Sequence, residues 1–253
     1  MSEWAIGLIT LLCVFGGALA GLGLQRVLPE QHLRDDSKDV VRLVSGLLAT
    51  LAALVLGLLI ASAKGAYDQV SDGIRQSAAK VVVIDRLLAE YGTEANAARA
   101  QLKLHYAERF ARLFPDPRSP HDVGNALPDS SNLEGFAVAL RALAPANDAQ
   151  RHALSKIREI VGDLMMERWL TFEKAYGSIP TGLLVVLVSW LVMMFASFGL
   201  FSPRNATALT SLFVGALAVS TSIFLIEEMN RPFEGWIALS GEAMRVTLAV
   251  LGK

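Results

Sequence analysis

The sequence contains almost no cysteine and no excess of either charge. Its single cysteine, Cys13, excludes an intrachain disulfide and a cysteine-based metal site, and its place inside an apolar run favours a small buried hydrophobe. The 23 Lys and Arg against 24 Asp and Glu leave a net charge of −1. Because nucleic-acid binding needs a clustered basic excess, we expect no nucleic-acid partner.

Catalytic motifs are missing as well. The chain has no P-loop, no GxSxG, no HExxH and no CxxC pattern. Its four histidines are scattered without the paired spacing of metal ligands, and we interpret them as surface residues: His32, His105, His121 and His152. We therefore expect no enzyme activity, no cofactor and no bound metal.

Long apolar runs dominate what is present. Hydrophobic residues make up 53% of the chain and charged residues 19%, so the two kinds must be segregated. Four runs are long enough for a helix to cross the roughly 30 Å core of a bilayer: Trp4–Gln25, Leu43–Ala63, Ile179–Ser202 and Ala206–Ile226. No strand alternation occurs in the sequence. These patterns predict an all-α membrane protein with four transmembrane helices.

The polar stretch between the second and third runs predicts a helical extramembrane domain. We divide the chain into transmembrane helices 1 and 2 (1–64), a helical cytoplasmic domain (65–177), transmembrane helices 3 and 4 (178–228) and an amphipathic C-terminal tail (229–253). A helical period after the second run predicts that this span continues as one long helix until Tyr91-Gly92. The distribution of Lys and Arg favours the cytoplasmic side of a bacterial inner (plasma) membrane for the domain.

The first run carries a helix-packing motif. No Lys or Arg precedes it, so the charged start of a signal peptide is missing and we interpret the run as a retained helix. Gly17 and Gly21 are spaced as in GxxxG, with Gly16 and Gly23 nearby. Because glycine lets helix backbones approach closely, this spacing predicts a face for close helix packing.

The second run has one side made of very small residues. They recur at intervals of four, three, four and four and therefore share one helical face: Gly46, Thr50, Ala53, Gly57 and Ala61. Such a face either packs against the first or fourth span, or lines a conduction path at the axis of a ring of copies. Both interpretations stay open at this point.

Charges that flank the spans indicate candidate pore mouths. Arg42 and Lys64 bracket the second run, Asp68 follows one turn later, and Arg231 follows the fourth run. Rings of the three basic residues favour anions, whereas a ring of Asp68 does the reverse. The span centres hold no ionisable side chain, which argues against an ion-coupled transporter but not against a channel. For the hydroxyls of Ser220–Ser222 three roles stay open: lining a water-filled path, cross-linking helices, or bonding to the backbone of their own helix.

Two segments resemble a known family. The chain is similar to the bestrophin-like domain family of bacteria and plants in LPEQHLRDDSKDVVRLVSGLLATLAALVLGLLIASAKGAYDQ and in RPFEGWIALS, and the resemblance covers nearly the whole chain. It implies a pentameric, mostly helical ion channel with a cytoplasmic helical domain and a pore lined by the second span. Bestrophins pass anions, although some bacterial members are similar to cation channels. Unlike the bestrophin neck, this second span has no aromatic residue between Arg42 and Tyr67.

We therefore expect an oligomeric, anion-conducting channel whose partners are the lipid bilayer, inorganic ions and further copies of the chain. Two other classes stay open. One is a non-conducting membrane scaffold or sensor whose helical domain binds a partner, and the other is a uniporter-like carrier. The mass of the protein in detergent separates some of these classes, because a monomer or dimer contradicts a ring channel.

Overall fold

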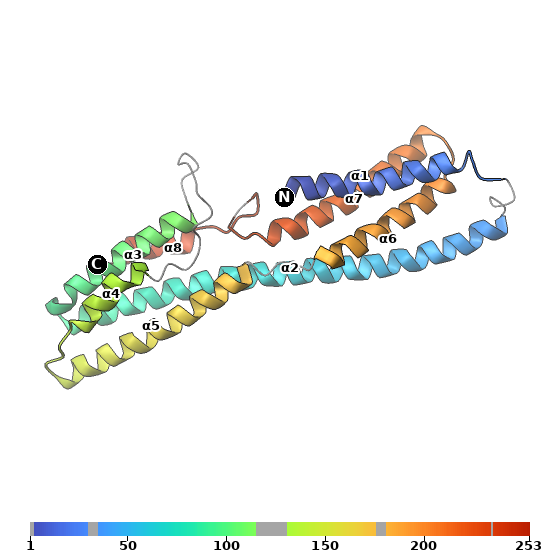
Figure 1. Ribbon diagram of the computed structural model, residues 1–253. Coiled ribbons are helices and arrows are strands. Elements are labelled where there is room, and N and C mark those ends of the chain that lie inside the picture. The colour runs from blue at the N-terminus through green and yellow to red at the C-terminus, as the bar shows by residue number, and fades with distance from the viewer. Residues whose placement is uncertain (1–2, 30–34, 115–130, 176–180, 234) are drawn as a thin grey trace. The chain divides into compact units, whose positions relative to one another are not determined.

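The computed structural model describes residues 3–29, 35–114, 131–175, 181–233 and 235–253, and these residues contain helices and no strand. Four of the helices are long and apolar enough to cross a membrane, α1, α2, α6 and α7 (Figure 1). The all-helical prediction with four candidate spans is thus confirmed. The bounds are α1 Glu3–Leu24, α2 Asp35–Tyr91, η2 Thr93–Ala95, α3 Asn96–Leu113, α4 Ser131–Arg141, α5 Asp148–Ala175, α6 Thr181–Leu200, α7 Ala206–Met229 and α8 Glu242–Val250.

The chain divides into two compact units. The membrane unit comprises Met1–Ala66 and Gly177–Arg231, and the helical unit comprises Tyr67–Tyr176 and Pro232–Lys253. Helix α2 supplies its first half to one unit and its second half to the other, as one helix of 57 residues. It ends at Tyr91, as the sequence predicts, because Gly92 takes a φ of +122° that an α-helix does not allow.

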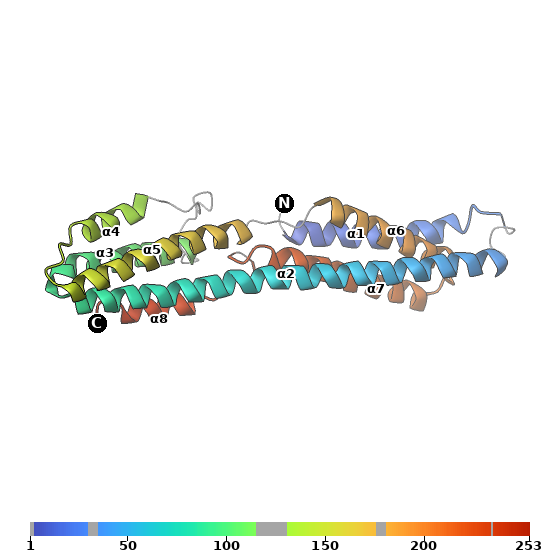
Figure 2. The same cartoon turned by 90° about the horizontal axis from the view of Figure 1, so that it is seen from below.

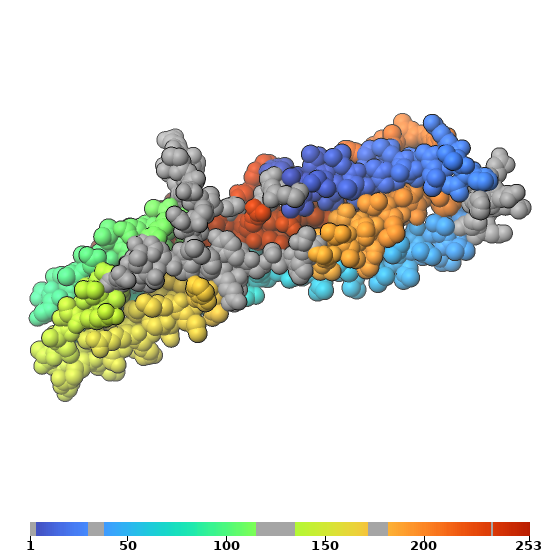
Figure 3. All heavy atoms as spheres, viewed as in Figure 1, coloured from blue at the N-terminus to red at the C-terminus, as the bar shows by residue number. Residues whose placement is uncertain are grey.

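Close packing of α1 against α6 holds the membrane unit together. A Cβ added at Gly21 would overlap the carbonyl oxygen of Ala196, and one added at Gly17 would lie 2.9 Å from the carbonyl oxygen of Val192. From the other side, Gly199 of α6 meets the carbonyl of Ala18 in the same way. The space-filling view shows the two helices lying against each other (Figure 3). The predicted packing role of the GxxxG spacing is confirmed, because only residues without a side chain allow this approach.

The hydroxyl groups of α7 have two different roles. Ser220 is buried, and its Oγ donates a hydrogen bond to the carbonyl oxygen of Gly7 at 2.5 Å, which links α7 to α1. Thr221 and Ser222 instead donate to carbonyls of their own helix at 2.8 and 3.0 Å. Of the three roles considered for this cluster, Ser220 therefore cross-links two helices. Thr221 and Ser222 instead bond to the backbone of their own helix.

The outer side of α1, which carries Leu12 and Cys13, is apolar and exposed in the described part of the chain. Cys13 is exposed there, beside Leu12 with 63% of its surface accessible. The expectation of a buried Cys13 is thus wrong for the single chain. The reason is that a membrane-spanning helix keeps apolar residues on the side that meets lipid as well as on the side that meets protein.

The helical unit has an apolar core of its own. Helices α3, α5 and α8 lie beside the second half of α2 (Figures 1 and 2). The periodic positions of α2 point into this core and are all buried: Val70, Ile74, Ala78, Val81, Ile84 and Leu88. Phe136 and Leu140 of α4 and Ile157 and Leu164 of α5 complete it. Burial of this one face explains why α2 stays helical beyond the membrane-length run.

The C-terminal tail belongs to the helical unit rather than forming a separate segment. Leu239, Met244 and Leu251 are buried in the same core. A polar contact also holds the end of the chain, because the backbone N–H of Gly252 donates to the buried carboxylate of Asp85 at 3.3 Å. The division proposed from the sequence at residue 229 differs here, since a short amphipathic helix needs an apolar partner and the adjacent core supplies one.

Candidate functional site

The small-residue face of α2 points away from its own chain. All five predicted pore-lining residues are exposed: Gly46, Thr50, Ala53, Gly57 and Ala61. At Gly46 and Gly57, an added Cβ would have nothing within 4 Å in the described part of the chain, apart from the helix's own backbone. The alternative that this face packs against the first or fourth span is therefore wrong for the single chain.

A different face of α2 makes the contacts inside the membrane unit. Ser45, Ala52, Leu59 and Ala63 are buried, and they recur at intervals of seven, seven and four residues. With 3.6 residues per turn, this buried face and the small-residue face are centred roughly 130° apart around the helix axis. The fold thus uses one side of α2 for packing and leaves the small-residue face open.

The small-residue face has small side chains and almost no polar groups that could coordinate an ion. Its only polar side chain is Thr50, whose Oγ1 donates to the carbonyl oxygen of Leu47 at 2.8 Å. The hydroxyl oxygen retains lone pairs, but its proton is engaged, so the face presents no spare side-chain donor to an ion. The run from Leu43 to Ala63 holds no ionisable side chain, so charged groups lie only beyond the two ends of this face.

Two of the predicted mouth charges continue the spacing of the small-residue face. Arg42 precedes Gly46 by four residues and Lys64 follows Ala61 by three, and both are exposed. At about 1.5 Å per residue, the two charges lie roughly 33 Å apart along the helix, close to the thickness of a bilayer core. Arg42 forms an ion pair with Asp39 at 3.6 Å, and because both side chains are more than 70% exposed this pair contributes little stability.

The other two predicted mouth residues, Asp68 and Arg231, do not belong to the small-residue spacing of α2. Asp68 follows Lys64 by one helical turn and is exposed. Arg231 is exposed in the turn after α7, where its backbone N–H donates to the carbonyl of Glu228 at 3.3 Å. Each of the four mouth residues occurs once in a chain, so a ring of any of these charges requires further copies of the protein.

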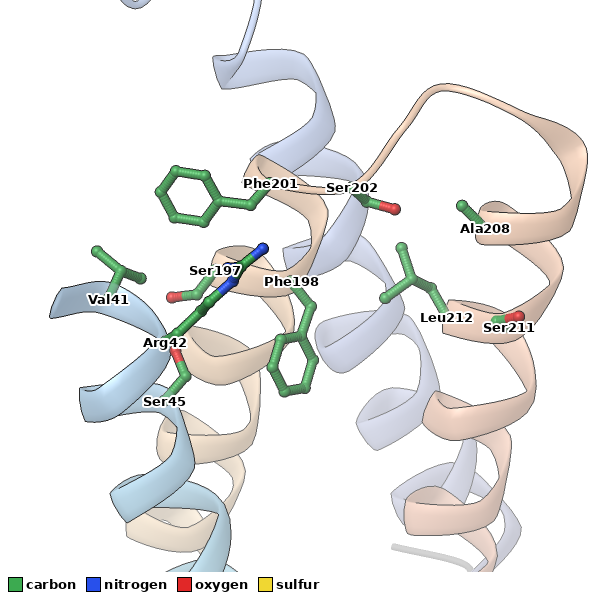
Figure 4. A pocket seen from close by; sticks show the side chains of 10 residues that line it. All are labelled: Val41, Arg42, Ser45, Ser197, Phe198, Phe201, Ser202, Ala208, Ser211 and Leu212. Carbon is green, nitrogen blue, oxygen red and sulfur yellow. The ribbon is translucent and has the colours of Figure 1, made fainter. Parts of the chain in front are cut away.

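A pocket of about 360 Å³ opens beside Arg42, between the start of α2, the end of α6 and the start of α7. Figure 4 shows the guanidinium of Arg42 directed toward Ser197 and Phe198. Sequence reasoning missed this pocket, because it joins positions that lie far apart in the chain. Its lining is Val41, Arg42, Ser45, Ser197, Phe198, Phe201, Ser202, Ala208, Ser211 and Leu212.

The described helices and their apolar surfaces define a membrane protein with four candidate spans and a charged helical unit. The family model of the bestrophin-like domain matches residues 12–244, and the chain therefore belongs to the bestrophin-like domain family. The match begins within α1 and ends within α8, so it includes both units. No curated protein and no solved structure matches the chain.

Proposed function

We propose that this chain forms an oligomeric ion channel, in which the small-residue face of α2 from each copy lines a central path. Four helices of one chain do not enclose a pore, whereas a closed ring of copies does. A pentamer is the proposed ring, as the family resemblance implies. Membership of the bestrophin-like family supports a channel-type function.

The proposal rests on a difference in exposure between two sets of small residues. Gly17 and Gly21 of α1 are in contact with the backbone of α6. Gly46 and Gly57 of α2 are equally small, yet they are exposed. On a surface that meets only lipid, a strip of small residues gains nothing over leucine, which occupies most of the other exposed positions of the apolar run of α2, such as Leu54.

We propose anions as the conducted ions. Each copy contributes three basic residues near the ends of the spans, Arg42, Lys64 and Arg231, against one acidic residue, Asp68. In a ring these charges are repeated, and a positive potential at the mouths raises the local concentration of anions. We further propose that the helical unit lies in the cytoplasm of a bacterium whose inner membrane holds the channel.

The test is ion flux from liposomes that contain the purified full-length protein. We expect halide flux from the wild type, and a loss of about tenfold or more in Thr50→Trp, because an indole fills a path lined by small residues. The matched control is Leu12→Trp, which places the same side chain on the exposed side of α1 and leaves flux unchanged.

Two outcomes contradict the proposal in different ways. Robust flux that Thr50→Trp leaves intact removes α2 from the path but keeps a channel. Absence of flux from a well-reconstituted protein, together with a monomeric mass in detergent, favours a membrane scaffold or sensor instead.

A further inference from the structure

Two arginines lie together inside the helical unit, on α3 and α5. Arg109 Nη1 donates to Ser77 Oγ on α2 at 3.5 Å. Arg168 Nη1 lies 3.3 Å from Nε2 of His105. His105 is buried, so its interpretation as a surface residue is wrong. The ring of the buried Tyr106 is the fifth member of this group, which joins three helices.

The two guanidinium groups interact electrostatically with each other, and no acidic partner occurs for them among the described residues. Burial, followed by the positive charge of Arg109, lowers the pKa of Arg168 to about 9. Burial also lowers the pKa of Arg109. No carboxylate among the described residues forms an ion pair with either guanidinium group.

Two other partly buried cations in the described part of this unit are paired with carboxylates. Arg99 makes a two-bond contact with Asp85 at 2.9 and 3.0 Å. Lys80 binds Glu167, the acid next to Arg168 in the chain, at 2.5 Å. Among the described residues, carboxylates thus pair with Arg99 and Lys80 but not with Arg109 or Arg168.

One N–H donor of the two arginines has no hydrogen-bond partner among the described residues. The Nε atom of Arg168 is fully buried and has no hydrogen-bond partner among the described residues. Desolvation of two like charges and of an unpartnered N–H is costly, because the neutral contacts with Ser77 and His105 replace only part of the water that these groups lose. An anion that accepts from both guanidinium groups removes all three costs at once.

We propose that Arg109 and Arg168 form a binding site for one oxyanion of the phosphate type, held between α3 and α5. Two guanidinium charges match a dianion, and the fork of N–H groups on each arginine fits the oxygen atoms of a phosphate. The hydroxyls of Ser77 and Tyr106 border the same place. The bound ion joins α3 to α5 and so stabilises the helical unit.

The test uses thermal unfolding of the full-length protein in detergent. Inorganic phosphate replaces chloride at constant ionic strength, and acetate serves as the monoanionic comparison. We expect phosphate to raise Tm by about 3 °C or more over chloride, since a ligand that binds only the folded state stabilises it. A short-chain phosphatidylglycerol tests the second source of the same chemistry, because a lipid headgroup also carries a phosphate.

Substitution of the arginines gives the sharper result. Arg168→Gln and Arg109→Gln lose the phosphate-dependent rise in Tm. In chloride alone, each variant is as stable as the wild type or more so, because one of two repelling buried charges is gone. Arg151→Gln removes an exposed arginine of α5 and keeps the full rise. Amide hydrogen exchange in α3 and α5 gives a local readout, which phosphate slows in the wild type and in Arg151→Gln but not in Arg109→Gln or Arg168→Gln.

Three results overturn the proposal. Neither inorganic phosphate nor the lipid raises the Tm of the wild type beyond chloride and acetate, or the rise persists unchanged in both arginine variants, or both variants are destabilised in chloride as much as in phosphate. A rise caused by the lipid and not by inorganic phosphate, and lost in the variants, supports the site and identifies a headgroup phosphate as the occupant. The effect of Ser77→Ala decides the matter if an arginine variant does not fold, because it should weaken the rise without removing it.

Discussion

Gly21 of α1 lies so close to the carbonyl of Ala196 on α6 that no side chain fits between them. The contact sets the distance between the two helices, since Gly17 and Gly199 meet their partner backbones along the same crossing. The glycines of this crossing are covered by backbone, whereas Gly46 and Gly57 of α2 are exposed.

The first prediction concerns this crossing. Gly21→Val forces α1 and α6 apart, and we expect a loss of about 1–3 kcal/mol of stability, seen as a lower Tm in detergent. Gly23→Val is the control on the same helix, because an added Cβ there has nothing within 4 Å among the described residues. Equal losses in both variants would show that the crossing does not hold the membrane unit together.

The second prediction concerns the end of the chain. Asp85→Asn breaks the buried contact with Arg99 and weakens the bond from Gly252. We expect a cost of about 3 kcal/mol, because Arg99 is left buried without its partner, and faster amide exchange in the tail. Glu159→Gln removes one side of an exposed pair with Lys156 and should cost about 0–1 kcal/mol. An unchanged exchange rate in α8 would separate the tail from this contact.

The third prediction tests the small-residue face by chemical modification. In a Cys13→Ser background, Ala53→Cys and Gly57→Cys place single thiols on the face, and Leu12→Cys places one on the outer side of α1. A charged thiol reagent should reduce halide flux by about tenfold in the first two and leave the third unchanged, because only a water-filled path admits the reagent. Modification of Leu12→Cys alone would reverse the assignment of the two surfaces.

The fourth prediction tests the mouth charges. Arg42→Glu combined with Lys64→Glu should lower the ratio of anion to cation flux by about fivefold or more, because the sign of the potential at both ends changes. The effect should shrink at high salt, where exposed charges are screened over about 10 Å or less. Arg151→Glu, far from α2 in sequence and exposed on α5, is the control. An unaltered ratio places the selectivity of the path elsewhere.

Helix positions could be predicted, because a helix depends on residues that are neighbours in sequence. Its hydrogen bonds join residues four apart, and its apolar face repeats every 3.6 residues. The end of α2 at Tyr91, the run of buried positions from Val70 to Leu88 and the shared face of Gly46 and Gly57 all follow from this local geometry.

Which faces meet was decided by the tertiary structure. Gly17 with Gly21 and Gly46 with Gly57 are similar patterns, yet α6 covers the first pair and no part of the described chain covers the second. Three other features also join segments that are distant in the sequence. They are the burial of His105, the proximity of the two cations Arg109 and Arg168, and the place of Leu251 in the core of the helical unit. Such contacts depend on the free energy of packing many side chains at once, and a spacing along one helix does not contain that information.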